Sequence, residues 1–186
     1  MSVAGRATGF GQPEAGILQI AYVVDDLHAA IEAWLAEGVG PWYVLDRWLP
    51  EDGLYRGEVN RAEIAAALAF SGHTQIELLQ PLDDHPSVYR EVLEERGAGF
   101  HHIARGAAEF DVEVASYRER GFALAFSAVV GTGSRVAYLD TRSTMPGFVE
   151  LIETTPANDA FFTAIYEAAK TWDGSAPVRP FEALRY

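Results

Sequence analysis

Four polar residues interrupt apolar, strand-like segments of this 186-residue chain. They are Gln19 in GILQIAYVV, Glu77 in TQIELLQ, His102 in GFHHIARG and Glu150 in GFVELIET. A carboxylate buried between aliphatic neighbours is costly unless it is paired. If two such carboxylates converge, they repel each other strongly unless a cation or a shared proton lies between them. For one buried Glu a structural role would explain the pattern as well as a functional one.

An internal repeat relates the four positions. Placing Gln19 on His102 aligns LQIA with HHIA and, at the same offset, matches the helix that follows. Placing Glu77 on Glu150 aligns QIELL with FVELI at a smaller offset. The difference between the two offsets falls in loops, which tolerate changes of length. Two related halves would bring all four polar strands around one centre, and this favours a metal ion bound there.

The elements that must position these residues can be predicted from apolar patterning. Strands are expected at 16–24, 42–49, 62–70, 74–80, 99–106, 122–129, 134–141 and 147–154, and helices after Asp25 or Asp26, at 87–97, 109–121 and 158–172. The composition of AEIAAALAF (62–70) suggests a helix, but its neighbours favour a strand. The segment from Glu51 to Gly57 is predicted to be a polar turn.

The predicted fold class is α+β: two tandem βαβββ modules form a curved mixed sheet around a central metal pocket, with an added C-terminal helix. The expected organisation is an N-terminal arm (1–15), a domain at 16–155 and a C-terminal helix and tail (156–186). Within the domain, module one is 16–81, a connecting helix is 86–97 and module two is 99–155.

Composition excludes several classes of function. The chain has no cysteine, so thiolate metal sites, disulfides and a Cys nucleophile are excluded. The net charge of −13 opposes binding to nucleic acid. No segment has the roughly 20 apolar residues of a membrane span, and MSVAGRATGFGQ does not resemble a signal peptide. We therefore expect a cytoplasmic protein.

The segment LQIAYVVDDLHAAIEAW resembles the opening strand and helix of the vicinal-oxygen-chelate superfamily. That superfamily includes glyoxalase I, methylmalonyl-CoA epimerase, extradiol dioxygenases and bleomycin-resistance proteins. TQIELLQP followed by GFHHIA is similar to the epimerase and glyoxalase-like branch, and GFVELIE is similar to the last strand. The resemblance covers roughly residues 16–155.

The resemblance implies that Gln19, Glu77, His102 and Glu150 are the metal ligands. The epimerase pattern has His where this chain has Gln19, and this departure argues against the two-His, one-carboxylate iron site of a dioxygenase. The Gln, Glu, His, Glu set resembles one form of glyoxalase I. Its oxygen donors and single imidazole suit one divalent ion, namely Zn, Mn, Co, Ni or Mg, with Fe less favoured.

Strand alternation assigns roles to the neighbouring residues. His101 should face away from His102, as a core histidine bonded to backbone. Gln75 should share the face of Glu77, and Phe148 that of Glu150, so both are candidate substrate contacts. Tyr138 is a third candidate, although aromatic strand residues are more often simply core.

The resemblance implies proton abstraction next to a carbonyl, with metal-stabilised enolate chemistry on a small oxo compound or acyl thioester. Glu150 is the favoured base, with Glu77 as ligand or opposing acid/base. The expected activity is thus that of an isomerase, epimerase or lyase, in a homodimer that binds a small molecule. Two alternatives remain open: a non-catalytic binding protein of the bleomycin-resistance type and a ring-cleaving dioxygenase.

Overall fold

The computed structural model describes residues 7–186, which form one mixed sheet with helices on both faces. The strands are β1 (Ile17–Val23), β2 (Trp42–Trp48), β3 (Leu54–Tyr55), β4 (Glu58–Val59), β5 (Ile64–Ser71), β6 (Thr74–Pro81), β7 (Gly99–Ala107), β8 (Ala123–Val129), β9 (Arg135–Asp140), β10 (Phe148–Glu153) and β11 (Val178–Pro180). The helices are α1 (Leu27–Ala36), α2 (Val88–Arg96), α3 (Phe110–Glu119), α4 (Pro156–Lys170) and the 3₁₀ helix η1 (Phe181–Ala183). The predicted α+β class is confirmed.

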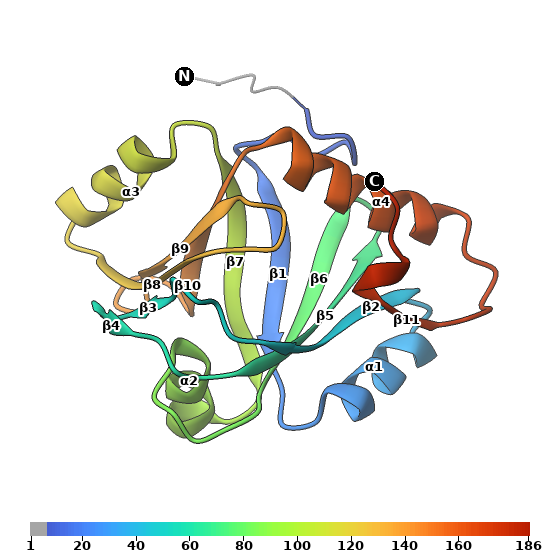
Figure 1. Cartoon of the computed structure of the whole chain (residues 1–186), viewed down its shortest axis with the longest axis horizontal. Coiled ribbons are helices and arrows are strands. Elements are labelled where there is room, and N and C mark those ends of the chain that lie inside the picture. Colours follow the sequence, from blue (N-terminus) through green and yellow to red (C-terminus); the bar gives the residue numbers. More distant parts are fainter. Residues whose placement is uncertain (1–6) are drawn as a thin grey trace.

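The sheet consists of two halves with the same strand arrangement. Its order is β11-β2-β5-β6-β1-β7-β10-β9-β8-β3-β4, so β1 and β7 meet in the middle, and β6 and β10 flank them. Figure 1 shows these two central strands with α1 and α3 at opposite ends of the molecule. In one half Gln19 lies opposite Gln75, and in the other His102 lies opposite Phe148. These pairs reproduce both alignments expected from the repeat.

The alanine-rich segment 62–70 forms strand β5, as its neighbours predicted, and the reason is its two-sided burial. Ile64, Leu68 and Phe70 point into the core cluster shared with α2 and α4. The intervening residues, among them Ala65 and Ala67, pack into a second cluster under α1. Small side chains on one face let the helix approach closely, while large ones fill the other face.

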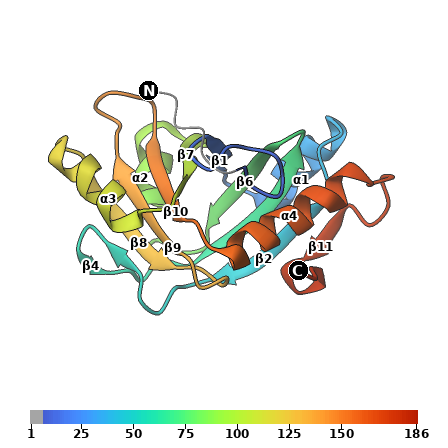
Figure 2. The ribbon, with the colours of Figure 1, turned by 90° about the horizontal axis from the view of Figure 1, so that it is seen from above.

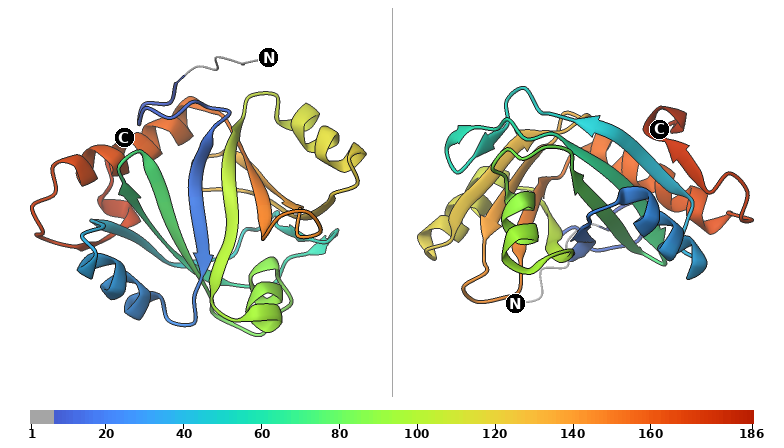
Figure 3. Two further views of the ribbon diagram at one scale, coloured as in Figure 1. Left: turned by 180° about the vertical axis from the view of Figure 1, so that it is seen from behind. Right: turned by 90° about the horizontal axis from the view of Figure 1, so that it is seen from below.

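Two faces of the sheet are covered differently. On one face, α1 packs over β5 and β6, and α3 packs over β8, β9 and β10. On the other face, α2 and α4 contribute Tyr89, Phe161, Phe162 and Ile165 to the largest core cluster. Figure 2 shows the curved sheet from above with α4 along its first half, and Figure 3 shows the two central strands from behind. The curvature leaves room between the halves for a central site.

Side-chain caps fix where three helices begin. Asp26, Ser87 and Thr155 each accept a hydrogen bond from a backbone N–H three residues on, at 3.0 or 3.1 Å. Such caps satisfy one of the free N–H groups of the first turn and typically contribute about 1 kcal/mol each. Within residues 7–186 no helix has both the length and the apolarity to span a membrane.

The predicted polar turn from Glu51 to Gly57 is wrong in part, because it contains strand β3 and leads into β4. Arg56 and Gly57 both have positive φ angles, 48° and 89°, as a tight hairpin turn requires. Strand β3 pairs with β8 of the other half, placing Leu54 opposite Ser127. Two-residue strands are too short to show alternation, and the three-residue β11, which pairs with β2, was missed for the same reason.

A network of ion pairs joins β3, α2 and β9 at one end of the sheet. Arg142 contacts Asp140 at 2.7 Å and Glu91 at 2.8 Å, and Arg56 contacts the same two carboxylates. These arginines hold the pKa values of Asp140 and Glu91 below their usual range. Carboxylates with depressed pKa values stabilise the fold at neutral pH and lose that contribution as the pH falls.

Replacing Arg142 with Met should therefore lower the free energy of unfolding by about 1–3 kcal/mol at pH 7. The difference in the free energy of unfolding between wild type and variant should shrink below about pH 4, where Glu91 and Asp140 begin to take up protons in the unfolded chain. Urea unfolding at pH 7 and pH 3 measures both values. Arg47→Met is the control, because Arg47 is 70% exposed in its pair with Glu63 and should matter by less than about 1 kcal/mol. An equal loss at both pH values would contradict this account.

Candidate functional site

The four central strands bring the predicted polar residues together. His102 Nε2 lies 3.1 Å from Glu150 Oε2 and 3.5 Å from Glu77 Oε2. The His102 side chain is fully buried, and those of Glu77 and Glu150 are 15% and 7% exposed. The fourth residue, Gln19, is also buried and extends its amide toward Glu77. The site thus has one side chain from each of β1, β6, β7 and β10.

Burial controls the ionisation of this cluster. It raises the pKa of Glu150 and, together with repulsion from Glu150, raises the pKa of Glu77 well above its usual value. The hydrogen bond from Gln19 acts in the opposite direction on Glu77. Burial also lowers the pKa of His102 to about 3, so this imidazole is neutral. Two carboxylates that resist ionisation are thus placed beside an uncharged imidazole.

The prediction that His101 faces away from the site is wrong, whereas the prediction of a core histidine bonded to backbone is confirmed. The register between β1 and β7 shifts here: Ala21 lies opposite His102, whereas the next residue, Tyr22, lies opposite Phe100. His101 is the extra residue of a β-bulge, and a bulge breaks the alternation on which the prediction depended. Its Nδ1 lies 2.8 Å from His102 Nδ1.

Gly147, which has a φ of 113°, makes room for the bulge. A Cβ at this position would lie 2.5 Å from the backbone oxygen of His101. Only glycine combines this backbone conformation with such a close approach. The loop before β10 therefore fits directly against the bulged strand.

The hydrogen bonds of His101 define which nitrogen of His102 is protonated. His101 Nε2 lies 3.1 Å from the carbonyl oxygen of Val88, so it must carry a hydrogen and donate it. Burial lowers the pKa of His101 well below its usual value, so its Nδ1 has no hydrogen and accepts a bond. His102 Nδ1 must then be the donor. We therefore assign a bare Nε2 on His102, with its lone pair toward the carboxylates.

The donor atoms have the chemistry of a metal site. Gln19 Oε1, Glu77 Oε2 and His102 Nε2 are buried and have no hydrogen-bond partner among the described residues. Donors that share an ion at about 2.1 Å lie roughly 3.0–3.4 Å apart, close to the contacts at this site. However, no three His, Asp or Glu side chains in residues 7–186 are arranged as a preformed metal centre. A metal ion here is thus a proposal, which the unpaired donors support.

A cavity of about 510 Å³ opens beside Gln19, Glu77 and Glu150. Its walls are mainly aliphatic and aromatic, with side chains from β2, β5, β6, β9, β10 and the C-terminal segment. The apolar lining residues are Leu45, Trp48, Ile64, Ala66, Leu68, Leu79, Val130, Val136, Ile152, Phe161, Phe162 and Phe181. A cavity of this size suits a small organic molecule, with the polar cluster as the reactive end.

Two tyrosines complete the polar end. The hydroxyl groups of Tyr89 and Tyr138 lie 3.5 Å apart, and both residues line the cavity. Burial raises both pKa values, so both phenols stay protonated and can donate a hydrogen bond to a ligand oxygen. Tyr138 is a candidate from the sequence, whereas Tyr89 was missed. The apolar spacing of Val88, Tyr89 and Val92 on one face of α2 was the signal that could have identified it.

The other two proposed substrate contacts lie outside the lining of this cavity. Gln75 is 1% exposed, and both atoms of its amide lack a partner among the described residues. Phe148 is fully buried and packs against His101, with ring centroids 5.1 Å apart. Phe148 therefore packs against the bulged His101. Gln75 does not line the cavity, so its role as a substrate contact stays a prediction.

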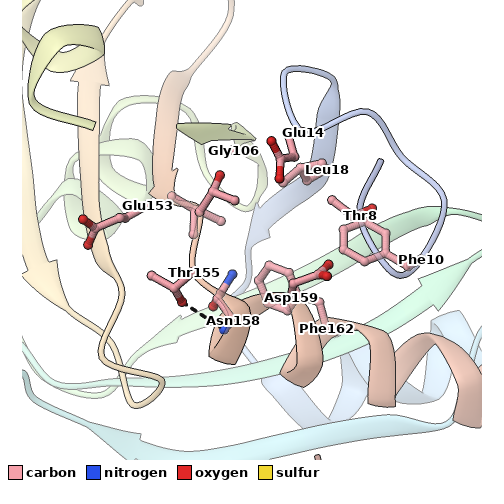
Figure 4. Close-up of a pocket in the computed structure, with 12 residues that line it drawn as sticks. Thr8, Phe10, Glu14, Leu18, Gly106, Glu153, Thr155, Asn158, Asp159 and Phe162 are labelled. Atoms are coloured by element: carbon pink, nitrogen blue, oxygen red, sulfur yellow. Dashed lines mark hydrogen bonds between the residues drawn. The ribbon is translucent and has the colours of Figure 1, made fainter. Parts of the chain in front are cut away.

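A much smaller crevice, of about 20 Å³, lies between the N-terminal segment, β10 and the start of α4 (Figure 4). Phe10 and Phe162 form its apolar side, and Asp159 accepts a hydrogen bond from the N–H of Gly9 at 2.8 Å. A space of this size holds little more than a water molecule. The large cavity is therefore the better candidate for ligand binding.

Comparison with known proteins defines the family. The model of the Glyoxalase/Bleomycin resistance protein/Dioxygenase superfamily matches residues 18–138. Because the match covers more than half of the chain, the protein belongs to this superfamily. No curated protein sequence matches the chain.

Among solved structures, the chain is similar to methylmalonyl-CoA epimerase from Mycobacterium tuberculosis, with 25% identity and a TM-score of 0.57. That match covers 78% of this chain and 91% of the epimerase. A variant of the Streptomyces coelicolor epimerase in complex with 2-nitronate-propionyl-CoA has 25% identity and a TM-score of 0.55, over 75% of this chain and 96% of its own. A methylmalonyl-CoA epimerase in complex with methylmalonyl-CoA and NH4+ has 24% identity and a TM-score of 0.55, over 76% and 95%.

Proposed function

We propose that this protein is a divalent-metal-dependent isomerase, epimerase or lyase that removes a proton next to the carbonyl of a small oxo compound or acyl thioester. The observation that carries the proposal is the bare Nε2 of His102, which faces two buried carboxylates at one end of an apolar cavity. Three lone-pair donors in contact need a proton or a cation between them. Enolate chemistry uses both, because a proton is moved at carbon and a cation stabilises the negative charge on oxygen.

Gln19, Glu77, His102 and Glu150 would hold the ion. Their amide, carboxylate and imidazole donors suit Zn, Mn, Co, Ni or Mg. When bound, the ion would supply a Lewis acid that stabilises negative charge on a substrate oxygen.

The residues of the chain would move the proton. Glu150 takes it from the carbon next to the carbonyl, and the electron pair of that C–H bond moves toward the carbonyl oxygen. In the metal-free site burial raises the pKa of Glu150, and a carboxylate with a raised pKa is a stronger base than an exposed one. Tyr138 and Tyr89 remain protonated and donate hydrogen bonds toward the developing negative charge. Glu77 acts as a ligand, or returns a proton on the opposite face.

The named neighbours support this reaction class. They are called methylmalonyl-CoA epimerases, and a racemising enzyme must remove and return a proton at carbon. The sequence prediction of a homodimer in the cytoplasm stays a prediction, and light scattering of the purified protein would test the dimer.

The test combines metal analysis with isotope exchange. Protein purified without a His tag should contain about one divalent ion per chain by elemental analysis. With that ion, it should catalyse the exchange of deuterium from D₂O into at least one member of a panel of oxoacids, ketones and acyl thioesters, as seen by NMR. Metal-free protein that binds a panel member without exchange would instead indicate a binding protein. Oxygen uptake with a catechol and Fe(II) would indicate a ring-cleaving dioxygenase.

His101 provides an independent test of the metal site. Replacing it with Leu removes the acceptor that holds His102 in its assigned tautomer, and should weaken Co²⁺ or Zn²⁺ binding about 10–100-fold. His101→Gln is the matched control, because its amide can still accept from His102 and donate to the carbonyl of Val88. Metal titration by calorimetry, with circular dichroism to check the fold, measures the effect. Unchanged affinity in the Leu variant would contradict this role.

A further inference from the structure

The charged groups that line the large cavity are all acidic. Among the described residues, the lining includes Glu77, Glu150 and Glu182, but no lysine or arginine. Enzymes hold phosphate and other anionic groups with Arg, Lys or free helix N-termini. The chain as a whole carries a net charge of −13, which also opposes an anionic ligand.

The helix end that reaches the cavity offers no anion site. Asn158 in the first turn of α4 lines the cavity, but its N–H is already capped by the Thr155 hydroxyl at 3.1 Å. Asp159 adds a negative charge in the same turn. The Asn158 side chain accepts a hydrogen bond from Thr132, which ties the loop between β8 and β9 to α4. The N-terminus of this helix is therefore already capped by Thr155 and carries Asp159 in its first turn, so it is not free to bind an anion.

The C-terminal segment forms an aromatic wall of the cavity. Phe161, Phe162, Phe181 and Tyr186 all line it. The ring centroid of Phe161 lies 5.5 Å from that of Phe181 and 5.3 Å from that of Tyr186, so the rings support one another. Pairing of β11 with β2 fixes the chain just before Phe181. This wall is therefore a defined surface for a flat apolar ligand.

We propose that the substrate is an uncharged, largely apolar oxo compound with an aromatic or alicyclic body, and not a CoA thioester. Its carbonyl lies at the cluster of Glu77, His102 and Glu150, and its body packs against Phe161 and Phe181. This inference rests on the proposed function for the reactive end, and on the cavity lining for the body. It separates this chain from its structural neighbours, two of which are described in complex with CoA compounds.

The test uses 2-tetralone, an uncharged bicyclic ketone, as the probe. Its binding to the purified protein is followed by tryptophan fluorescence, since Trp48 lines the cavity. Comparison with a carboxylated tetralone of the same skeleton measures the effect of a negative charge on binding. Comparison with acetoacetyl-CoA tests whether a CoA thioester binds. We expect 2-tetralone to bind at least about tenfold more tightly than either anionic compound, because nothing in the described lining neutralises a buried negative charge. Equal or tighter binding of acetoacetyl-CoA would overturn the inference.

A pair of variants tests the aromatic wall. Phe181 is only partly buried and lies near the C-terminus, so its replacement should leave the fold intact. Phe181→Arg should weaken 2-tetralone binding at least about tenfold, whereas Phe181→Leu should change it by less than about threefold. Unchanged binding to the Arg variant would also overturn the inference. Tight binding without deuterium exchange into 2-tetralone would instead count against the proposed function and leave the ligand class standing.

Discussion

Glu150→Gln is expected to slow proton exchange by about 10²–10⁴-fold, which is the usual contribution of a positioned general base. The amide has nearly the same shape as the carboxylate, but it cannot accept a proton near neutral pH. Its N–H₂ group can donate to the bare Nε2 of His102, 3.1 Å from the present carboxylate oxygen, so the strand and its packing should be retained. The loss should therefore be chemical and not structural.

The initial rate of deuterium exchange measures the effect, and thermal unfolding verifies the fold. Glu153→Gln is the matched control on the same strand, because Glu153 pairs with Arg135 and does not line the cavity. This control should lose some stability but keep its exchange rate. If the Glu150→Gln protein exchanged deuterium at the wild-type rate, Glu150 would not be the base.

Addition of a divalent ion should raise the melting temperature, and should raise it more at pH 8 than at pH 6.5. The cause is the difference between the number of protons bound by the folded and by the unfolded metal-free protein. Burial lowers the pKa values of His101 and His102, so both are neutral in the folded protein. Well above pH 6.5 they are neutral in the unfolded chain too. Glu77 and Glu150 have raised pKa values in the folded protein, so it holds more protons than the unfolded chain.

Stability falls with rising pH wherever the folded state holds more protons than the unfolded state. For each protonated carboxylate the slope is about 1.4 kcal/mol per pH unit. From pH 6.5 toward 8, the metal-free protein should thus become less stable, and an ion that replaces these protons should restore the loss. Differential scanning calorimetry with and without Mn²⁺ or Zn²⁺, with EDTA as the reference, measures both effects.

Two variants separate this effect from other titrating groups. Metal-free Glu150→Gln should lose much of the pH slope and become more stable than the metal-free wild type at pH 8. The double variant with Glu77→Gln should show neither effect. A wild-type protein whose stability does not change between pH 6.5 and 8 would show that these carboxylates do not hold extra protons.

Much of the architecture could be predicted because the residues that align in the repeat lie in regular strands. The alignments of Gln19 with His102 and of Glu77 with Glu150 appear again in the register of the two halves, and they place these four residues around one centre. Apolar alternation is a strong signal for the longer strands, since it is repeated several times along each.

The residues that were misjudged lie where the local rule is broken. The bulge at His101 depends on the pairing of β7 with β1, which are far apart in the sequence, and on the space left by Gly147. Alternation could not decide whether Gln75 and Phe148 reach the cavity, because the curvature of the sheet decides how far the cavity extends along a strand. Their role as substrate contacts stays a prediction. A C-terminal helix and tail were predicted, but their contact with the cavity is set by tertiary packing.

The pairing of β3 with β8 has a consequence for how the chain folds. The hairpin of the first half completes the sheet of the second half, where Arg56 also pairs with Asp140. The repeat suggests two units, yet neither half can bury its own edge without the other. We therefore expect the halves to unfold in one cooperative transition, and to refold slowly, because contacts between residues distant in sequence must form before the sheet is complete.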